Sequence, residues 1–251
     1  MKFLAAWQFL TAIPVPWRRE ATPEDLARSM VYFPVVGLII GLILAGLNWL
    51  MAIVLPTAVV NLFLIVFLVV LTGALHLDGF VDTFDGIAGH KPVEDRWRVM
   101  HDSRAGAFGI VGVVLLLLAK YVSLNSIPWS LMMATLIFMP IVSRWAMVYT
   151  IFAYPYARPA GLGKAFKQGA SWSRFIVATL ITFAVAVALV PLFQLTGLVV
   201  MFGIWVITVL MATYFKSKFS GLTGDTYGAI NEVAEVSTLV LIILLVQLGL
   251  A

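Results

Sequence analysis

Long apolar segments dominate this chain and limit the folds open to it more than any other feature. They cover approximately residues 31–55, 57–77, 107–127, 129–152, 173–193, 195–215 and 231–250. Each is close to the ~20 residues that an α-helix needs to cross the hydrocarbon core of a bilayer. With 62% hydrophobic and 11% charged residues, the sequence predicts an all-α, polytopic integral membrane protein with about seven transmembrane helices.

The basic residues predict the orientation of these helices. Of the 16 Lys and Arg residues, thirteen lie in the N-terminal segment and in the long connections 78–106, 153–172 and 216–230, and Arg174 lies just after the second of these connections, while Lys120 and Arg144 lie within apolar segments. Cytoplasmic loops carry the excess of Lys and Arg in membrane proteins. We therefore expect the N-terminus and the long loops, with the site they carry, in the cytoplasm, and the C-terminus outside.

The rest of the composition narrows the classes further. The net charge of +4 is explained by membrane orientation, so we expect no nucleic-acid partner. The chain has no cysteine, which excludes disulfides and thiolate metal sites. The first 16 residues lack a convincing signal-peptide cleavage site and are interpreted as an interfacial segment. Without a repeat or a linker, residues 1–251 are expected to form a single transmembrane domain.

An acidic stretch between Gly73 and Gly89 is the strongest indication of chemistry. As a helix, it places Asp78, Asp82 and Asp85 on one face, at spacings of four and three residues. Neighbouring carboxylates about 6 Å apart repel by roughly 2.8 kcal/mol at an effective dielectric of ~20. A divalent cation, nearby Arg or Lys, or a bound proton would offset that repulsion. We interpret the stretch as a metal site.

The segment after the acidic stretch adds phosphate-binding chemistry. Asp102 supplies a fourth carboxylate, and Arg98, His101 and Arg104 lie beside it in the sequence. Carboxylates that hold Mg²⁺ next to Arg side chains are suited to reactions of a diphosphate. For Arg96 and Arg98, the alternative is a basic helix that rests on anionic lipid.

Two further stretches are predicted to lie on the same face of the membrane. Residues 154–166 form a Gly- and Pro-containing loop with Arg158 and Lys164, and residues 221–235 carry Asp225 between glycines and then two glutamates. Acidic residues at or inside a span are functional candidates. Structural ion pairs are the alternative; they would join Glu232 and Glu235 to Lys216, Lys218 or Arg144.

Four motifs give the chain a resemblance to a known family. They are His76-Leu-Asp-Gly-Phe-Val-Asp-Thr-Phe-Asp-Gly86, His101-Asp-Ser-Arg-Ala-Gly-Ala-Phe-Gly109, Tyr154-Pro-Tyr-Ala-Arg-Pro159 and Gly221-Leu-Thr-Gly-Asp225. Together they resemble the cobalamin synthase family, whose members are adenosylcobinamide-GDP ribazoletransferases. Their order and the length of the chain make the resemblance specific.

The resemblance implies a reaction and a location. Family members join adenosylcobinamide-GDP to α-ribazole, or to its 5′-phosphate, and release GMP with the help of Mg²⁺ in a late step of cobalamin biosynthesis. The implied location is the bacterial cytoplasmic (inner) membrane. The expected substrate-binding residues are His76, His101, Arg158, Thr223 and Asp225 within the quoted motifs, and Arg98 and Lys164 as basic residues beside them.

The acidic and basic residues then take catalytic roles. We expect Asp78, Asp82, Asp85 and Asp102 to hold Mg²⁺, with Asp82 also the base that accepts the proton of the attacking hydroxyl. The expected catalytic residues are Asp82, Asp85 and Arg104, the last neutralising charge on the phosphates.

Other functions remain open from the sequence. A CDP-alcohol phosphotransferase would share the pattern of Asp82, Asp85 and Gly86, but Ala88 and Gly89 stand where that family has Ala-Arg. A prenyltransferase-like enzyme and a cation-coupled transporter are further alternatives. The sequence also leaves open the choice between ribazole and its phosphate, a homo-oligomer, and docking of upstream corrinoid-pathway enzymes on the cytoplasmic face.

Overall fold

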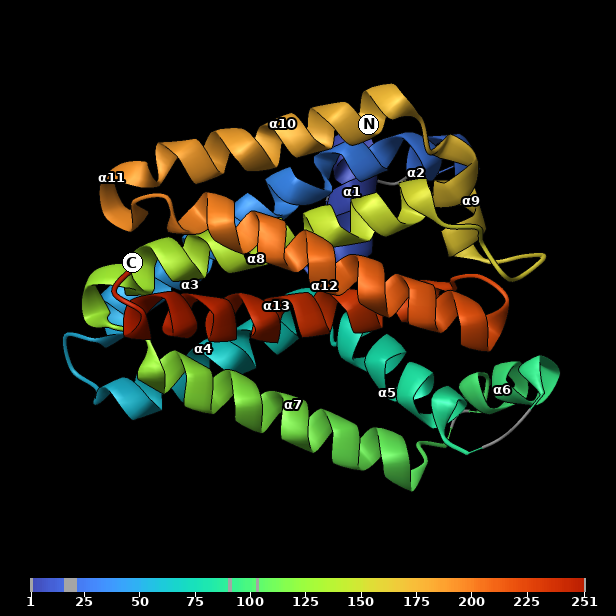
Figure 1. Cartoon of the computed structure of the whole chain (residues 1–251), viewed down its shortest axis with the longest axis horizontal. Coiled ribbons are helices and arrows are strands. Elements are labelled where there is room, and N and C mark those ends of the chain that lie inside the picture. Colours follow the sequence, from blue (N-terminus) through green and yellow to red (C-terminus); the bar gives the residue numbers. More distant parts are fainter. Residues whose placement is uncertain (1, 16–21, 90–91, 103, 251) are drawn as a thin grey trace.

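The computed structural model describes residues 2–15, 22–89, 92–102 and 104–250 as an assembly of helices (Figure 1). Over these residues there is no β-strand, only an isolated bridge between Tyr156 and Leu222. The helices are α1 (Lys2–Leu10), α2 (Pro23–Ser29), the 3₁₀ helix η1 (Met30–Tyr32), α3 (Phe33–Met51), α4 (Thr57–Thr72), α5 (Leu75–Ile87), α6 (Val93–Met100), α7 (Ala107–Ser126), α8 (Trp129–Ala153), α9 (Leu162–Gly169), α10 (Trp172–Ala188), α11 (Val190–Phe193), α12 (Thr196–Phe219) and α13 (Gly224–Gln247).

Several of these helices are long and apolar enough to cross a membrane. Within the described ranges there are five such helices, and two bent pairs, α4 with α5 and α9 with α10, bring the number to seven. The prediction of a polytopic all-α membrane protein is confirmed. Apolar side chains on the outside of the bundle fit a lipid environment; on α7, for example, Val111, Leu115, Leu118 and Val122 form an exposed stripe at helical spacing.

The predicted second span, residues 57–77, is wrong in one respect. The helix breaks after Thr72, and α5 leaves α4 at an angle of 89°. Gly73 and Ala74 both have left-handed backbone angles, with φ of 60° and 56°, which ends α4 and redirects the chain. The acidic residues therefore lie on a separate helix and not on a loop that follows a straight span.

The predicted loop 216–230 is also wrong for most of its length. Helix α12 continues to Phe219, and α13 begins at Gly224, so residues 220–223 alone connect them. Thr223 starts α13 through a capping box with Thr226, in which each side chain bonds the other residue's backbone N–H. The connection brings Asp225 into the first turn of α13, inside the bundle rather than on a loop.

Helix α8 lies at the centre of the bundle, and 89% of the residues in its most apolar stretch are buried. It packs against α3 and α13, while α13 also contacts α5, α7 and α12. Figure 1 shows α13 in the middle of the molecule, with α5 and α6 at the end opposite to the C-terminus. The central helix α13 is therefore in direct contact with α5, the helix that carries the acidic residues.

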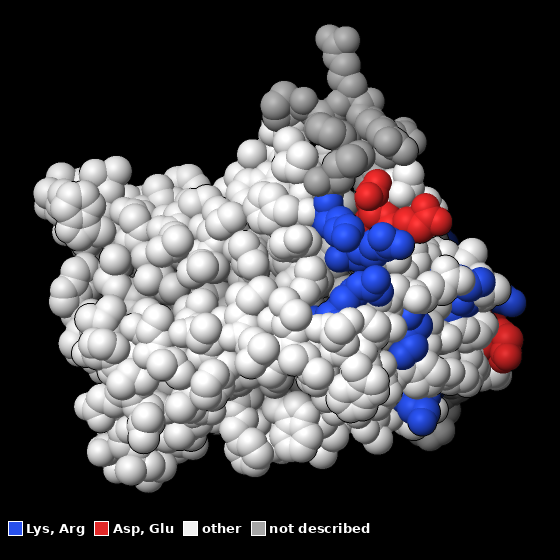
Figure 2. Space-filling model, turned by 90° about the horizontal axis from the view of Figure 1, so that it is seen from above, with Lys and Arg blue, Asp and Glu red and all other residues white. Residues whose placement is uncertain are grey.

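The charged residues gather at one end of the molecule. Figure 2 shows Lys, Arg, Asp and Glu at the end that carries α9 and the long connections, while the rest of the described surface in that view shows none of these charged residues. This agrees with the predicted segregation of charge. Arg18, Arg19 and Lys91 contributed to the prediction and lie outside the described residues.

Candidate active site

Helix α5 carries the predicted acidic stripe, and its three carboxylates have different surroundings. Asp78 is exposed, Asp82 is partly buried and Asp85 is buried, with 7% of its surface accessible. The helical interpretation of the stretch is confirmed. The helix lies against α7 and α13, so its acidic face extends from solvent at Asp78 into the bundle at Asp85. Because their surroundings differ in this way, the three carboxylates are not equivalent.

The Asp85 carboxylate is hydrogen-bonded to the start of α7. Its Oδ2 atom accepts a hydrogen bond from the backbone N–H of Gly106 at 2.7 Å, and its Oδ1 atom accepts one from the N–H of Gly109 at 2.8 Å. The first N–H groups of a helix have no partner within the helix, so this carboxylate satisfies them from 21 and 24 residues away. The predicted catalytic and metal-binding role of Asp85 stays a prediction.

A close contact between α5 and α13 places Asp78 and Asp82 near Asp225. A Cβ atom on Gly79 would lie 2.8 Å from the backbone oxygen of Asp225, so only glycine permits this approach. The Asp82 carboxylate is repelled by those of Asp225 and Asp78 and attracted by the Arg158 guanidinium. The structure thus adds Asp225 and Arg158 to the acidic stripe, although they are distant in sequence.

Backbone pairing holds Arg158 in this position. The N–H of Ala157 donates to the carbonyl of Leu222, and the N–H of Leu222 donates to that of Pro155, both at 2.8 Å. These bonds fasten the loop after α8 to the turn before α13. Arg158 then forms an ion pair with Asp225, with Nη2 and Oδ2 3.0 Å apart, and the Arg158 side chain is 15% exposed. A pair this sheltered is screened less by salt than a surface pair.

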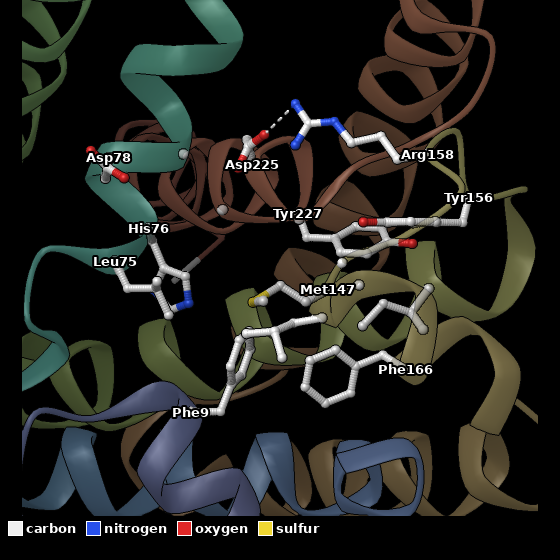
Figure 3. Close-up of a pocket in the computed structure, with 17 residues that line it drawn as sticks. Phe9, Leu75, His76, Asp78, Met147, Tyr156, Arg158, Phe166, Asp225 and Tyr227 are labelled. Atoms are coloured by element: carbon white, nitrogen blue, oxygen red, sulfur yellow. Dashed lines mark ion pairs between the residues drawn. The ribbon is translucent and has the colours of Figure 1, made fainter. Parts of the chain in front are cut away.

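A cavity of about 230 Å³ opens beside this pair. Figure 3 shows Asp78, Asp225 and Arg158 along one side of it and Met147, Phe9 and Phe166 along the other. His76 and Tyr156 also line it. The cavity therefore has a charged side and an apolar side. Its complete lining is Phe9, Leu75, His76, Asp78, Gly79, Met147, Ile151, Tyr156, Arg158, Gly161, Leu162, Gly163, Phe166, Gly224, Asp225, Tyr227 and Gly228.

Four of the predicted site residues, His76, Asp78, Arg158 and Asp225, line this cavity together. Of the other predicted site residues on the helices and turns around it, Asp82, Asp85, Thr223 and Lys164 lie outside its lining. Thr223 is buried as the cap of α13, with its hydroxyl also 3.4 Å from the Asp225 carboxylate. The Lys164 ammonium donates to the carbonyl of Pro159.

The predicted residues around α6 lie on the surface. Arg98 pairs with Asp95 at 3.2 Å, and the Nδ1 atom of His101 lies 2.6 Å from the carbonyl oxygen of Trp97. Asp102 binds Arg104 through both carboxylate oxygens, and this hydrogen-bonded guanidinium lowers the pKa of Asp102 to about 2. These residues face solvent outside the cavity, so their predicted contacts with a substrate stay predictions.

The donor chemistry near the cavity fits Mg²⁺, although the described residues include no group of three His, Asp or Glu side chains close enough to hold a metal ion. Mg²⁺ commonly uses one or two carboxylates and takes its other ligands from water and substrate phosphates. Asp78 and Asp82, one turn apart on α5, supply two such carboxylates beside an open cavity.

Two structural roles were not foreseen from the sequence. Arg96 is buried and donates to the carbonyls of Gly86 and Gly89 at 2.8 and 3.0 Å. It therefore closes the C-terminal end of α5, and the suggestion that it rests on lipid is wrong. Arg96 follows the end of α5 closely in the sequence. Because Arg side chains near a helix C-terminus can bond the last free carbonyls of that helix, this nearness was the signal available from the sequence.

Inside the bundle, four charged side chains form a network. Lys120 of α7 lies 2.6 Å from both Glu232 and Glu235 of α13, and Arg144 of α8 also pairs with Glu235. Of the pairs considered from the sequence, the one with Arg144 is present, and Lys120 is the partner that sequence reasoning missed. Two cations face two anions, so the formal charges balance within the network.

Comparisons with known proteins give a consistent result. The family model for cobalamin-5-phosphate synthase matches residues 2–243. A protein of Geotalea daltonii named adenosylcobinamide-GDP ribazoletransferase is 39% identical over 96% of both chains. Proteins with the same name from Roseiflexus sp. and Desulforamulus reducens are each 36% identical, over 93% and 95% of this chain and 86% and 94% of their own lengths. No solved structure matches the chain.

Proposed function

The chain belongs to the cobalamin-5-phosphate synthase family, and on that premise we propose that it is a ribazoletransferase that joins adenosylcobinamide-GDP to α-ribazole or its 5′-phosphate. The observation that carries this proposal is the family match along residues 2–243. The cavity adds support, because it combines carboxylates and a sheltered Arg with an apolar wall.

The reaction transfers the cobinamide phosphoryl group from a phosphate oxygen of GMP to an alcohol oxygen of ribazole. A ribose hydroxyl of ribazole attacks the phosphorus next to cobinamide, a new P–O bond forms, and the bond to the bridging oxygen of the diphosphate breaks. GMP leaves with that oxygen, and the hydroxyl proton passes to a base. The product is adenosylcobalamin or its 5′-phosphate.

Arg158 and Asp82 are the residues best placed to assist this step. The Nε atom of Arg158 is buried without a hydrogen-bond partner in the described part of the chain, so the guanidinium retains a donor for a phosphate oxygen while Asp225 fixes its position. Asp82 lies close to the carboxylates of Asp225 and Asp78 and to the Arg158 guanidinium, and we assign it the role of the base.

Asp78 and Asp82 would hold Mg²⁺. The bound ion would neutralise charge on the diphosphate and on the departing GMP. The protein's own contribution is to place the Asp78 carboxylate and the Arg158 guanidinium in the lining of the cavity, with Asp82 one turn further along α5.

The charged end is then the cytoplasmic end, in the bacterial inner membrane, where the activated corrinoid is present. Lipid surrounds the apolar face of the bundle, and the corrinoid-pathway enzymes that supply the substrate would dock at this end. We expect no nucleic-acid partner, and a homo-oligomer is compatible with the fold.

Purified protein in lipid, supplied with Mg²⁺ and adenosylcobinamide-GDP, tests the proposal. GMP should appear only after α-ribazole or its phosphate is added, together with an equal amount of the corrinoid product. Release of GMP without ribazole, or of GMP without the joined corrinoid, would refute the transfer reaction.

A further inference from the structure

The cavity is too small for a corrinoid but large enough for an aromatic base. An apolar cavity of about 150 Å³ can hold benzene, so a volume of about 230 Å³ accommodates a bicyclic ring. The apolar side is aromatic: the rings of Phe9 and Phe166 lie 4.7 Å apart between centroids. A corrin ring has several times this size and must remain outside, at the open end.

His76 brings an unused hydrogen-bonding group to this cavity. The residue is 2% exposed, and no group in the described parts of the chain hydrogen-bonds its Nε2 atom. Figure 3 shows the imidazole between Leu75 and Met147, on the same side of the cavity as Asp78. A buried polar atom without a partner destabilises the folded protein, so a ligand that supplies the partner binds more tightly.

Asn231 determines which hydrogen-bonding role Nε2 takes. The Nδ2 atom of Asn231 lies 3.3 Å from Glu235 Oε1 and 3.3 Å from His76 Nδ1. A carboxylate can only accept hydrogen bonds, so the Asn231 NH₂ group must face Glu235, and its second N–H then points to Nδ1. Nδ1 is therefore an acceptor, and the imidazole hydrogen resides on Nε2.

Glu235 in turn is held by the ion network. Its Oε2 atom lies 2.6 Å from the Lys120 ammonium, and its Oε1 atom pairs with Arg144. These contacts prevent rotation of the carboxylate, so the orientation of Asn231 is fixed as well. The network thus maintains an Nε2–H donor that faces the cavity.

We propose that this cavity binds the base of α-ribazole, with the free ring nitrogen of its dimethylbenzimidazole accepting a hydrogen bond from His76 Nε2–H. The base lies against Phe9, Met147 and Phe166, and the ribose extends toward Asp78 and Asp225, where the phosphoryl group is transferred. Asn231 and Glu235 are positioning residues for His76. The inference rests on the proposed function for the identity of the ligand.

Binding of two ribosides tests the proposal without requiring turnover. One is α-ribazole, and the other is its dimethylindole analogue, in which C–H replaces the free ring nitrogen. Equilibrium dialysis with the protein in lipid should show that the parent prefers α-ribazole about 10- to 100-fold, since the analogue leaves the donor unpaired. In His76→Leu the preference should fall to about one.

Three further variants make the result specific. His76→Gln retains an N–H near the position of Nε2 and should keep part of the preference, whereas His76→Asn, whose amide reaches only the Nδ1 position, should lose it. Asn61→Leu removes a buried amide that contacts Asn125 away from the cavity lining and should bind both ribosides as the parent does.

The tautomer has its own measurement. The chain contains three histidines, and ¹⁵N-histidine NMR can identify the His76 signals by their absence in His76→Gln. Nε2 should carry the hydrogen in the parent, and Asn231→Leu should give a mixture of tautomers and a weaker preference. A hydrogen on Nδ1 in the parent would overturn the role of Asn231.

The two proposals fail in different ways. Equal or absent binding of the two ribosides by the parent overturns this inference even where GMP release is normal. A preference for α-ribazole that depends on His76, without any ribazole-dependent GMP release, would support the base site and refute the transfer reaction.

Discussion

Replacing Asp85 with Asn tests whether the carboxylate of this residue is structural or catalytic. The sequence assigns Asp85 to catalysis and metal binding together with Asp82, whereas the structure places both Asp85 oxygens on backbone N–H groups of α7. The two residues lie three positions apart on one helix, so variants of each form a matched pair.

The size of the effect follows from the contacts. Hydrogen bonds to a charged group contribute roughly 1.5–3 kcal/mol each. The Asn variant keeps one carbonyl oxygen but turns an NH₂ group toward an N–H, so one bond is lost and two donors face each other. We expect Asp85→Asn to reduce the free energy of unfolding by about 2–4 kcal/mol, or Tm by roughly 5–15 °C.

Thermal unfolding in the same detergent measures this change, and GMP release measures activity well below the new Tm. Asp85→Asn should be less stable but retain activity within a few-fold at low temperature. Asp82→Asn should keep the stability of the parent and lose turnover by at least ~10². If Asp85→Asn were as stable as the parent and inactive, our assignment of this carboxylate to the start of α7 would be refuted.

Three other predictions concern charge and topology. Arg158→Lys should reduce kcat/KM by about 10- to 100-fold because a point charge replaces the guanidinium that Asp225 positions; an unchanged value in a steady-state assay would exclude a phosphate contact. Arg104→Gln should raise the pKa of Asp102 from about 2 toward 3.8, so that the carboxylate becomes protonated at a higher pH than in the parent. NMR titration of this carboxyl measures the pKa, and a value that stays near 2 would mean that another group keeps it low. A reporter fused after Gly169 should be active only in its cytoplasmic form and one fused to the C-terminus only in its periplasmic form; the reverse result at either site contradicts the proposed orientation.

Local patterns in the sequence were sufficient for part of the secondary structure around the site. The spacing of Asp78, Asp82 and Asp85 predicts the helix α5, and Pro92 with the acidic residues after it predicts the start of α6. Apolar length predicts the spans. These features depend on residues within a few turns of one another, and a single sequence displays them directly.

Contacts between distant residues were not accessible in the same way. The ion pair of Arg158 and Asp225 depends on backbone hydrogen bonds between two loops. The hydrogen bonds that Asp85 accepts depend on α7, a helix that begins 22 residues later. Asn231 carries no periodic or charge signal that points to His76. The break after Thr72 was also missed, because Gly73 and Ala74 are compatible with a continuing apolar helix in sequence alone.

The ion network inside the bundle has a consequence for how the protein is made. Lys120 enters the membrane with α7, but Glu232 and Glu235 belong to α13, which emerges from the ribosome after α7. An unpaired lysine within a transmembrane helix is disfavoured by about 3 kcal/mol on insertion scales. The same late helix supplies Asp225 and Asn231, so synthesis of α13 simultaneously neutralises Lys120 and completes the cavity. A nascent chain that stops short of α13 would therefore retain an unpaired lysine within the membrane.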